Sequence, residues 1–182
     1  MNGSTDITGW STNAAGSSYL YTCNAKTFFG GYPNFGTGVY ASKTYTGLPT
    51  PHYQVTVIAQ IALIDSWDNE TMYAYVDNTT VFEKSWDWMT GQSDYCGNKA
   101  GDPYWDYIGV VTSDAVAHTA SSLVLNFTSN LDKGGYDESW GFNEVQIIID
   151  LCDPACNACT GPSNTNCSSC NSGWYLEGTT CN

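Results

Sequence analysis

The cysteines of this 182-residue chain are distributed very unevenly. Six of the eight lie within residues 152–182, whereas the preceding 151 residues contain only Cys23 and Cys96. So short a segment cannot bury enough apolar surface to fold alone, and dense disulfides are the usual remedy in an oxidising environment. The pattern therefore predicts an extracellular or cell-surface chain with two parts, a larger body at residues 1–151 and a small disulfide-rich module at residues 152–182.

The charge balance is strongly acidic. Eighteen Asp and Glu residues oppose five Lys and Arg residues, which gives a formal net charge of −13. Such a surface repels phosphate backbones and anionic lipid headgroups, so we expect no nucleic-acid partner and no membrane insertion. No apolar run reaches the length of a membrane-spanning helix. Residues 1–6 have neither the basic start nor the apolar stretch of a signal peptide, so we expect a processed or partial chain.

Five tripeptides match the acceptor sequence for N-linked glycosylation, Asn-x-Ser/Thr without an intervening proline. Together with the eight cysteines, they favour a glycosylated, exported protein. The alternative is that several of them are unused, and we expect about half to carry glycan. The acceptor residues are Asn2, Asn69, Asn78, Asn126 and Asn166.

The body shows the two-residue periodicity of β-strands. Apolar side chains alternate with polar ones over residues 52–64, which predicts a strand with at least one buried face. The runs 71–76 and 80–86 flank an Asp-Asn turn and so predict a hairpin. Further strands are expected at residues 17–23, 38–45, 107–111, 121–127 and 144–151, and no segment has a sustained helical period.

About eight strands at short spacing indicate an all-β fold, an antiparallel two-sheet sandwich of the jelly-roll kind, followed by the small disulfide-rich module. Cys23 and Cys96 are the two cysteines left in the body, so we expect them to pair. On the chain-entropy model, that disulfide would stabilise the body by roughly 4 kcal/mol. The alternatives are a free thiol or a cross-link to another chain.

The spacing of the last six cysteines is C-x3-C-x2-C-x7-C-x2-C-x10-C. This spacing, with Gly161-Pro162 before the fourth cysteine and 173–176 (GWYL) before the sixth, resembles one furin-like repeat of the growth-factor-receptor cysteine-rich class. Cysteine spacing alone does not choose among the many pairings of six cysteines. The resemblance implies a rigid spacer or protein-binding rod with the disulfides Cys152–Cys159, Cys156–Cys167 and Cys170–Cys181.

A zinc site is the competing interpretation of the module. Its two Cys-x2-Cys pairs look like a four-cysteine zinc site. That site would leave Cys152 and Cys181 without partners, and the glycosylation sequences indicate export. We therefore expect disulfides.

Three segments of the body resemble parts of a known domain type. Residues 47–52 (GLPTPH), 64–68 (IDSWD) and 138–142 (ESWGF) are similar to β-sandwich domains that precede furin-like repeats in large surface proteins of protists, especially ciliates. The resemblance implies an extracellular module without assigned catalysis.

Oxygen-bearing side chains gather just after the long predicted strand. They include Asp65, Asp68 and Glu70. With Asp77, or with Asp132, Asp137 and Glu138 of another loop, they could complete the shell of about six to eight oxygens that Ca²⁺ requires. The alternative is a turn whose Asp and Asn side chains cap the backbone and face water. The predicted calcium ligands are Asp65, Asp68, Glu70, Asp77 and Asp137.

The connection between residues 86 and 107 is rich in aromatic side chains and carboxylates. Sugar-binding faces combine such groups, because a ring stacks on the pyranose while polar groups bind its hydroxyls. The predicted ligand-binding residues are Trp86, Trp88, Tyr104 and Trp105. The alternatives are that these rings close the end of the sandwich, pack beneath a glycan or form a subunit contact.

Catalysis has little support in the sequence. His52 and His118 are the only histidines, and neither lies in a nucleophile motif or a metal-binding pair. We therefore expect no enzyme and no catalytic residue.

The predicted function is that of an extracellular glycoprotein serving as a structural or adhesive module, the repeating subunit of a filament or surface coat. Its predicted partners are further copies of itself or other surface and matrix glycoproteins. The alternative is a lectin-like carbohydrate-binding module assisted by Ca²⁺.

Overall fold

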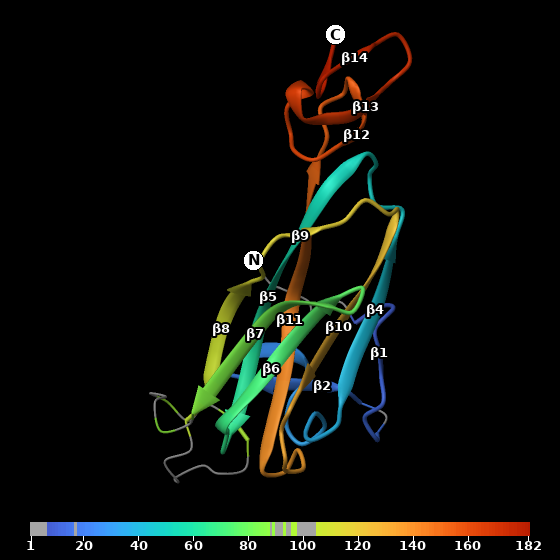
Figure 1. Ribbon diagram of the computed structural model, residues 1–182. Helices are drawn as coiled ribbons and strands as arrows, with labels where there is room; N and C mark the ends of the chain where they lie inside the picture. The colour runs from blue at the N-terminus through green and yellow to red at the C-terminus, as the bar shows by residue number, and fades with distance from the viewer. Residues whose placement is uncertain (1–6, 17, 88, 90–92, 94–95, 98–104) are drawn as a thin grey trace.

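The computed structural model describes residues 7–16, 18–87, 89, 93, 96–97 and 105–182. It shows two facing antiparallel sheets with the cysteine-rich segment at one end (Figure 1). The predicted all-β sandwich is confirmed. Among the described residues, no helix has the length and apolar character needed to span a membrane. The strands of the body are β1 (Ser11–Thr12), β2 (Leu20–Cys23), β3 (Lys26–Gly30), β4 (Tyr40–Thr46), β5 (His52–Asp65), β6 (Asp68–Val76), β7 (Thr79–Asp87), β8 (Tyr107–Thr112), β9 (Val116–Ala117), β10 (Ser122–Ser129) and β11 (Glu138–Leu151).

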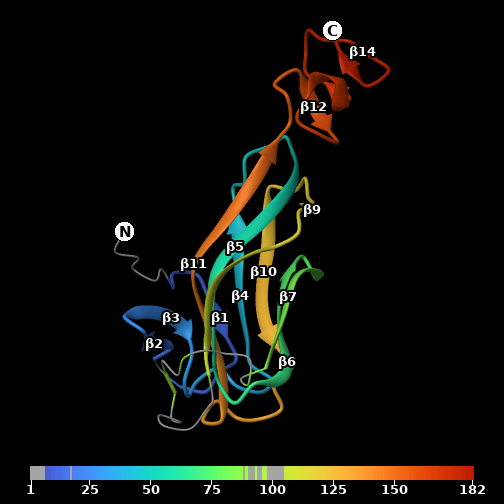
Figure 2. The same ribbon diagram turned by 90° about the vertical axis from the view of Figure 1, so that its left-hand side faces the viewer.

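The two sheets enclose one apolar core (Figure 2). One sheet has the strand order β1-β4-β10-β6-β7, and the other has the order β2-β3-β11-β5-β8, with β9 added against β5. The alternating residues of β5, from Val55 to Leu63, are buried and face Phe127 of the opposite sheet and Trp140 of β11 within this core. Full burial of such side chains stabilises the fold by about 1.5–3 kcal/mol each.

The long strands β5 and β11, of 14 residues each, form the spine of the molecule. They pair from Asp65 with Glu138 to His52 with Leu151. A bulge between Asn143 and Gln146 interrupts the register. The strand predicted at residues 144–151 begins at Glu138, six residues earlier. The bulge breaks the alternation of buried and exposed side chains, so the sequence pattern predicted only the part of the strand that follows it.

A second apolar cluster covers part of the outer face of the six-stranded sheet. Phe28 of β3 and Ile64 of β5 are fully buried there, beside the disulfide between Cys23 and Cys96. β3 was not predicted from the sequence, since its five residues are buried at Phe28, Phe29 and Gly30 in succession and show no alternation.

The cysteine-rich segment continues directly from β11 (Figure 1). It contains β12 (Cys156–Cys159), the 3-10 helix η2 (Asn164–Asn166), β13 (Cys167–Cys170), β14 (Leu176–Glu177) and β15 (Thr180–Cys181). The Cys152 N–H donates to the carbonyl oxygen of Pro51 at 3.1 Å and so ties the segment to the start of β5. The disulfides join Cys152 to Cys159, Cys156 to Cys167 and Cys170 to Cys181. With every sulfur of the segment in a disulfide, no thiolate is left for zinc.

Candidate functional site

The starts of β6 and β11 lie at the end of the sandwich opposite the cysteine-rich segment (Figure 1). Three carboxylates meet there. Glu70 belongs to β6 in the five-stranded sheet, and Glu138 is the first residue of β11 in the six-stranded sheet. Asp132 lies in the connection between β10 and β11. One oxygen atom from each of the three side chains lies within 4.8 Å of the other two. We call Glu70, Asp132 and Glu138 the acidic cluster.

Neighbouring hydrogen bonds fix the backbone around this cluster. The fully buried Trp67 donates from Nε1 to the carbonyl oxygen of Ser139 at 2.9 Å, which ties the β5–β6 connection to β11. The Asn130 side chain accepts from the Thr71 N–H at 2.5 Å, and the Asn130 N–H donates to the Thr71 carbonyl oxygen at 3.1 Å. The two sheets and the β10–β11 connection are thereby held in place where the carboxylates meet.

Burial makes the ionised form of the cluster unfavourable. The Glu138 side chain is 2 % exposed, and among the described residues its Oε2 has no hydrogen-bond partner. Burial, together with the charges of Glu70 and Asp132, raises the pKa of Glu138 from 4.5 to about 7, although a hydrogen bond from the Lys133 backbone acts in the opposite direction. Burial also raises the pKa of Glu70. The cluster is thus a pocket of negative charge that a cation would compensate.

The donor set fits a hard divalent cation such as Ca²⁺, which prefers carboxylate oxygens. Glu70, Asp132 and Glu138 offer six oxygens between them, and Ca²⁺ accepts carboxylates in either one- or two-oxygen contact. Lys133 lies at the exposed rim, where its Nζ is 3.0 Å from Asp132 Oδ1. This ammonium pairs with Asp132, the exposed member of the cluster, and among the described residues the buried Glu138 Oε2 has no hydrogen-bond partner.

The structure brings together part of the predicted calcium set. Glu70 lies in the cluster, and the Asp68 N–H beside it donates to Glu70 Oε2 at 2.5 Å. Asp77 lies seven residues after Glu70 in the sequence. With a rise of about 3.3 Å per residue along a β-strand, the two residues are about 23 Å apart, so Asp77 cannot bind the same ion.

Asp65 and Asp137 also lie outside the acidic cluster. Asp65 is the last residue of β5 and lies beside Gly97, and its N–H donates to Asp106 Oδ1 at 2.9 Å. Asp137 is exposed, and its carbonyl oxygen accepts hydrogen bonds from Ser66. The other two carboxylates of the cluster are Asp132 and Glu138, which the sequence offered together with Asp137 as the alternative to Asp77, and of these three Asp137 is the one that lies outside the cluster.

The predicted sugar-binding aromatics are only partly described. Trp86 is half-buried, with its ring centroid 4.9 Å from that of Tyr107, and its Nε1 donates to the Trp105 carbonyl oxygen at 3.3 Å. The Lys84 ammonium lies 5.1 Å from the Tyr107 ring centroid. These contacts fill the space between the edge strands β7 and β8 of the two sheets. For Trp86 they correspond to the alternative that the rings close the sandwich instead of binding a ligand. Trp88 and Tyr104 lie outside the described residues.

A different pair of aromatic side chains lies on the outer face of the five-stranded sheet. Tyr73 and Tyr75 of β6 are half-buried and stacked, with ring centroids 6.1 Å apart and an angle of 30° between the ring planes. In register, Tyr75 lies beside Asn126 and Tyr73 lies beside Glu83. Sequence reasoning missed this pair, although its alternation with the buried residues of β6 was a signal that both tyrosines face outward.

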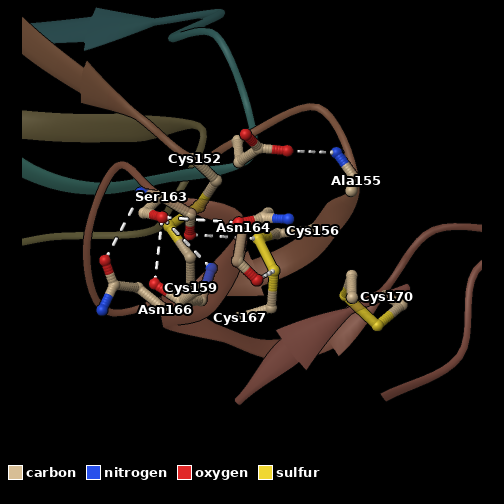
Figure 3. Close-up of a disulfide and its surroundings, with 12 residues drawn as sticks. Cys152, Ala155, Cys156, Cys159, Ser163, Asn164, Asn166, Cys167 and Cys170 are labelled. Atoms are coloured by element: carbon tan, nitrogen blue, oxygen red, sulfur yellow. Dashed lines mark hydrogen bonds between the residues drawn. A yellow bond between two sulfur atoms is a disulfide. The ribbon is translucent and has the colours of Figure 1, made fainter. Parts of the chain in front are cut away.

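The predicted glycosylation sites lie in different surroundings. Asn69 and Asn78 are exposed and have positive φ angles of 83° and 68°. Asn126 is half-buried on the central strand of its sheet. The Asn166 side chain accepts from the Ser163 N–H in the capping of η2, as Figure 3 shows. Asn2 lies outside the described residues.

Comparison with known proteins gives a resemblance in fold. No protein-family model matches the chain. The cysteine-rich with EGF-like domain protein 2-B of Xenopus laevis is 38 % identical over 39 residues, which are 21 % of this chain and 11 % of that protein. The chain therefore matches only about a tenth of that relative's length.

Three solved structures resemble the chain, each with a TM-score of 0.42. The sugar-binding C-terminal domain of EclA is 17 % identical and aligns over 59 % of this chain and 64 % of that one. The carbohydrate-binding module CBM36, solved with calcium and xylotriose, is 10 % identical, with coverage of 76 % and 99 %. The C-terminal CBM6 of the marine laminarinase LamC from Zobellia galactanivorans is 15 % identical, with coverage of 79 % and 94 %. The similarity concerns the β-sandwich.

Proposed function

We propose that this chain is a calcium-binding module of an extracellular glycoprotein and that carbohydrate is the ligand of its five-stranded sheet. The observation that carries the proposal is the buried Glu138 carboxylate, whose Oε2 has no hydrogen-bond partner among the described residues and which lies close to two further carboxylates. The four disulfides indicate an oxidising environment outside the cytosol, where extracellular modules bind Ca²⁺ through carboxylate and carbonyl oxygens. In this proposal the chain binds its ligand and does not catalyse a reaction.

A calcium ion in the acidic cluster would join the two sheets and the β10–β11 connection. It would neutralise the mutual repulsion of Glu70, Asp132 and Glu138 and give the buried Oε2 a ligand bond. Because the ion binds the folded chain alone, saturation at about a hundred times the dissociation constant stabilises the fold by about 2.7 kcal/mol. The role of the ion is to keep the end of the sandwich closed.

The outer face of the five-stranded sheet supports the carbohydrate role. Tyr73 and Tyr75 offer two stacked rings against which a pyranose can pack. Asn126 lies beside Tyr75, and Glu83 lies beside Tyr73, so amide and carboxylate groups flank the rings on either side. Rings flanked by such groups form the combination that recognises the apolar faces and the hydroxyls of a sugar.

A glycan array tests the carbohydrate role. The wild-type protein should bind a defined set of glycans, and Y73A and Y75A should each weaken that binding at least tenfold. Y175A is the matched control, because Tyr175 is 64 % exposed but lies in the cysteine-rich segment. Absence of glycan binding by the wild type, or equal binding by Y75A and Y175A, would contradict the assignment.

Glycosylation of the chain itself requires one further control. A glycan on Asn126 would lie on the same face as the tyrosines. T128A removes the acceptor sequence and keeps Asn126. If the chain's own glycan covers the face, T128A should bind external glycans better than the glycosylated wild type.

A structural subunit is the second candidate function. The long strands β5 and β11 run the length of the sandwich, and the cysteine-rich segment continues from β11 without a linker, which gives an elongated shape (Figure 2). Stiff, elongated units can assemble head to tail into filaments when the contact does not close into a ring. Negative-stain electron microscopy of the natively glycosylated protein tests this role, since regular filaments would support it and dispersed monomers would contradict it.

A further inference from the structure

A pocket lies between two connections at the end of the sandwich that carries the acidic cluster. Most of its walls come from the β3–β4 connection, residues 31–39, and from the β10–β11 connection, residues 130–137. Its volume is about 360 Å³. Small-molecule sites have volumes of about 300–1,000 Å³, so the pocket has room for a ligand at the lower end of that range. We call it the loop pocket.

The two connections are held together backbone to backbone. The Thr37 N–H donates to the Lys133 carbonyl oxygen at 2.8 Å. A Cβ atom on Gly36 would collide with the Gly135 nitrogen, and one on Gly135 would collide with the Pro33 carbonyl oxygen. Since only glycine fits at these two positions, the walls of the loop pocket are fixed where the connections touch.

Three side chains of the loop pocket have polar groups that can serve a ligand. Among the described residues, no side-chain hydrogen bond occupies the Asn34 amide, the Thr37 hydroxyl or the Tyr136 hydroxyl. Tyr136 is 69 % exposed, and its ring meets the ring of Tyr32 edge to face, with centroids 5.7 Å apart. Tyr32 therefore supports the Tyr136 ring, while most of the Tyr136 surface stays accessible.

We propose that the loop pocket binds one neutral sugar residue, at a site separate from Tyr73 and Tyr75 on the five-stranded sheet. A sugar ring offers an apolar face against which the Tyr136 ring can pack. Its hydroxyls can donate to and accept from the Asn34 amide and the Thr37 hydroxyl. The pocket thus combines a ring with polar groups in a space that holds a single sugar ring.

The charge around the loop pocket favours a neutral ligand over an anionic one. The β10–β11 connection contains two aspartates, Asp132 and Asp137, and its lysine, Lys133, already pairs with Asp132 at 3.0 Å. The whole chain carries a formal net charge of −13. Sugars with carboxylate or phosphate groups are therefore repelled, whereas neutral pyranoses are not.

The β10–β11 connection also supplies two carboxylates of the acidic cluster. Asp132 and Glu138 flank the segment 134–136, which lines the loop pocket. The N–H groups of Asp137 and Glu138 donate to the Gly134 carbonyl oxygen at 2.8 and 3.2 Å, so the segment forms a compact turn between the two sites. Calcium would fix both ends of this turn, and sugar affinity should therefore rise when calcium binds. This coupling rests on the proposed calcium site.

An NMR titration of the full chain in saturating Ca²⁺ tests the loop pocket. The probes are the methyl glycosides of glucose, galactose, mannose, xylose and N-acetylglucosamine. At least one should shift the backbone amide signals of residues 34–37 and 134–136, and these signals measure its affinity. Y136A should weaken the binding at least tenfold and T37V several-fold. Both side chains are exposed, so the two variants should fold.

Two tyrosine variants serve as controls. Y175A removes a similarly exposed ring, and Y75A removes a ring of the five-stranded sheet, so both should leave the affinity at the loop pocket unchanged. Absence of binding by all five glycosides would overturn the proposal. Equal binding by wild type and Y136A, or weakening by Y75A and not by Y136A, would also overturn it.

Repeating the titration in EDTA tests the coupling to calcium. The affinity for the sugar should fall at least several-fold. An equal affinity in EDTA, in a protein that calorimetry shows to bind calcium, would overturn the coupling and leave the calcium site unaffected. If calorimetry shows no calcium binding, the proposed calcium site is wrong, and Y136A and T37V alone decide whether the loop pocket binds sugar.

Discussion

Glu70 and Glu138 come from different sheets of the sandwich, yet oxygen atoms of their carboxylates lie within 4.8 Å of each other. Two like charges at that separation oppose the packing of the sheets, unless a cation lies between them or a proton neutralises one of them. The same contact therefore weakens the sandwich when no cation is bound and would join its two sheets when calcium is bound.

Removing the charge of Glu138 should stabilise the calcium-free protein. E138Q keeps the size of the side chain and abolishes its repulsion with Glu70 and Asp132, so we expect a gain of about 1–2 kcal/mol in the free energy of unfolding. Urea unfolding in the presence of EDTA measures the change. E144Q, on the same strand but exposed, is the control and should have little effect. A calcium-free E138Q protein less stable than wild type would contradict the electrostatic account.

The pKa of Glu138 predicts the pH dependence of the calcium-free protein. In the folded chain this pKa is raised from 4.5 to about 7, so between these values the folded state holds more protons than the unfolded state. The contribution of Glu138 to stability is therefore present below about pH 4.5 and is lost as the pH rises through about 7. Unfolding of wild type and E138Q in EDTA at pH 5 and pH 8 isolates this contribution. The advantage of E138Q should be larger at pH 8, and an equal advantage at both pH values would be inconsistent with the raised pKa.

Much of the fold was predictable because the chain alternates cleanly where strands bury one face. β5 begins at His52, as predicted, and the hairpin of β6 and β7 surrounds the Asp-Asn turn, where Asp77 and Asn78 both have positive φ angles. The sequence did not predict β3 or the first part of β11 as strands. Several successive residues are buried in each, so their apolar side chains do not alternate with polar ones.

Trp86 should be important for stability and not for ligand binding. Its ring packs against Tyr107 at the edge between the two sheets, so W86A should lower the free energy of unfolding by about 2 kcal/mol. Glycan binding by the folded fraction should be unchanged, in contrast to Y75A. Loss of glycan binding in W86A at full stability would restore the sugar-binding role that the sequence first indicated for this residue.

The disulfide between Cys23 and Cys96 should be the main covalent stabilisation of the body. It joins residues 73 apart in the sequence, and its Cys23 end is buried beside Phe28 and Ile64. Replacing both cysteines with alanine should cost roughly 4 kcal/mol on the chain-entropy model. Urea unfolding of the double variant measures this cost, and a loss below about 1 kcal/mol would show that the unfolded chain is not appreciably constrained by the bond.

The candidate site was less predictable than the fold. Glu70 was among the predicted ligands, and the sequence offered Asp132 and Glu138, together with Asp137, as further carboxylates from another loop. Which carboxylate points inward depends on the register of β11 against β5, and the bulge that shifts this register has no local signal in the sequence. The tyrosines of β6 were not predicted as ligand-binding residues, because exposed positions that alternate with buried ones occur on any strand with one solvated face.

Direct titration of the calcium-free protein with Ca²⁺ tests the central claim. Isothermal titration calorimetry should show one ion bound per chain, with binding at least tenfold weaker in E138Q and unchanged in E144Q. The melting temperature of wild type should fall on addition of EDTA. Absence of binding heat together with a melting temperature unaffected by EDTA, or equal affinity in wild type and E138Q, would contradict the assignment of a calcium site to Glu70, Asp132 and Glu138.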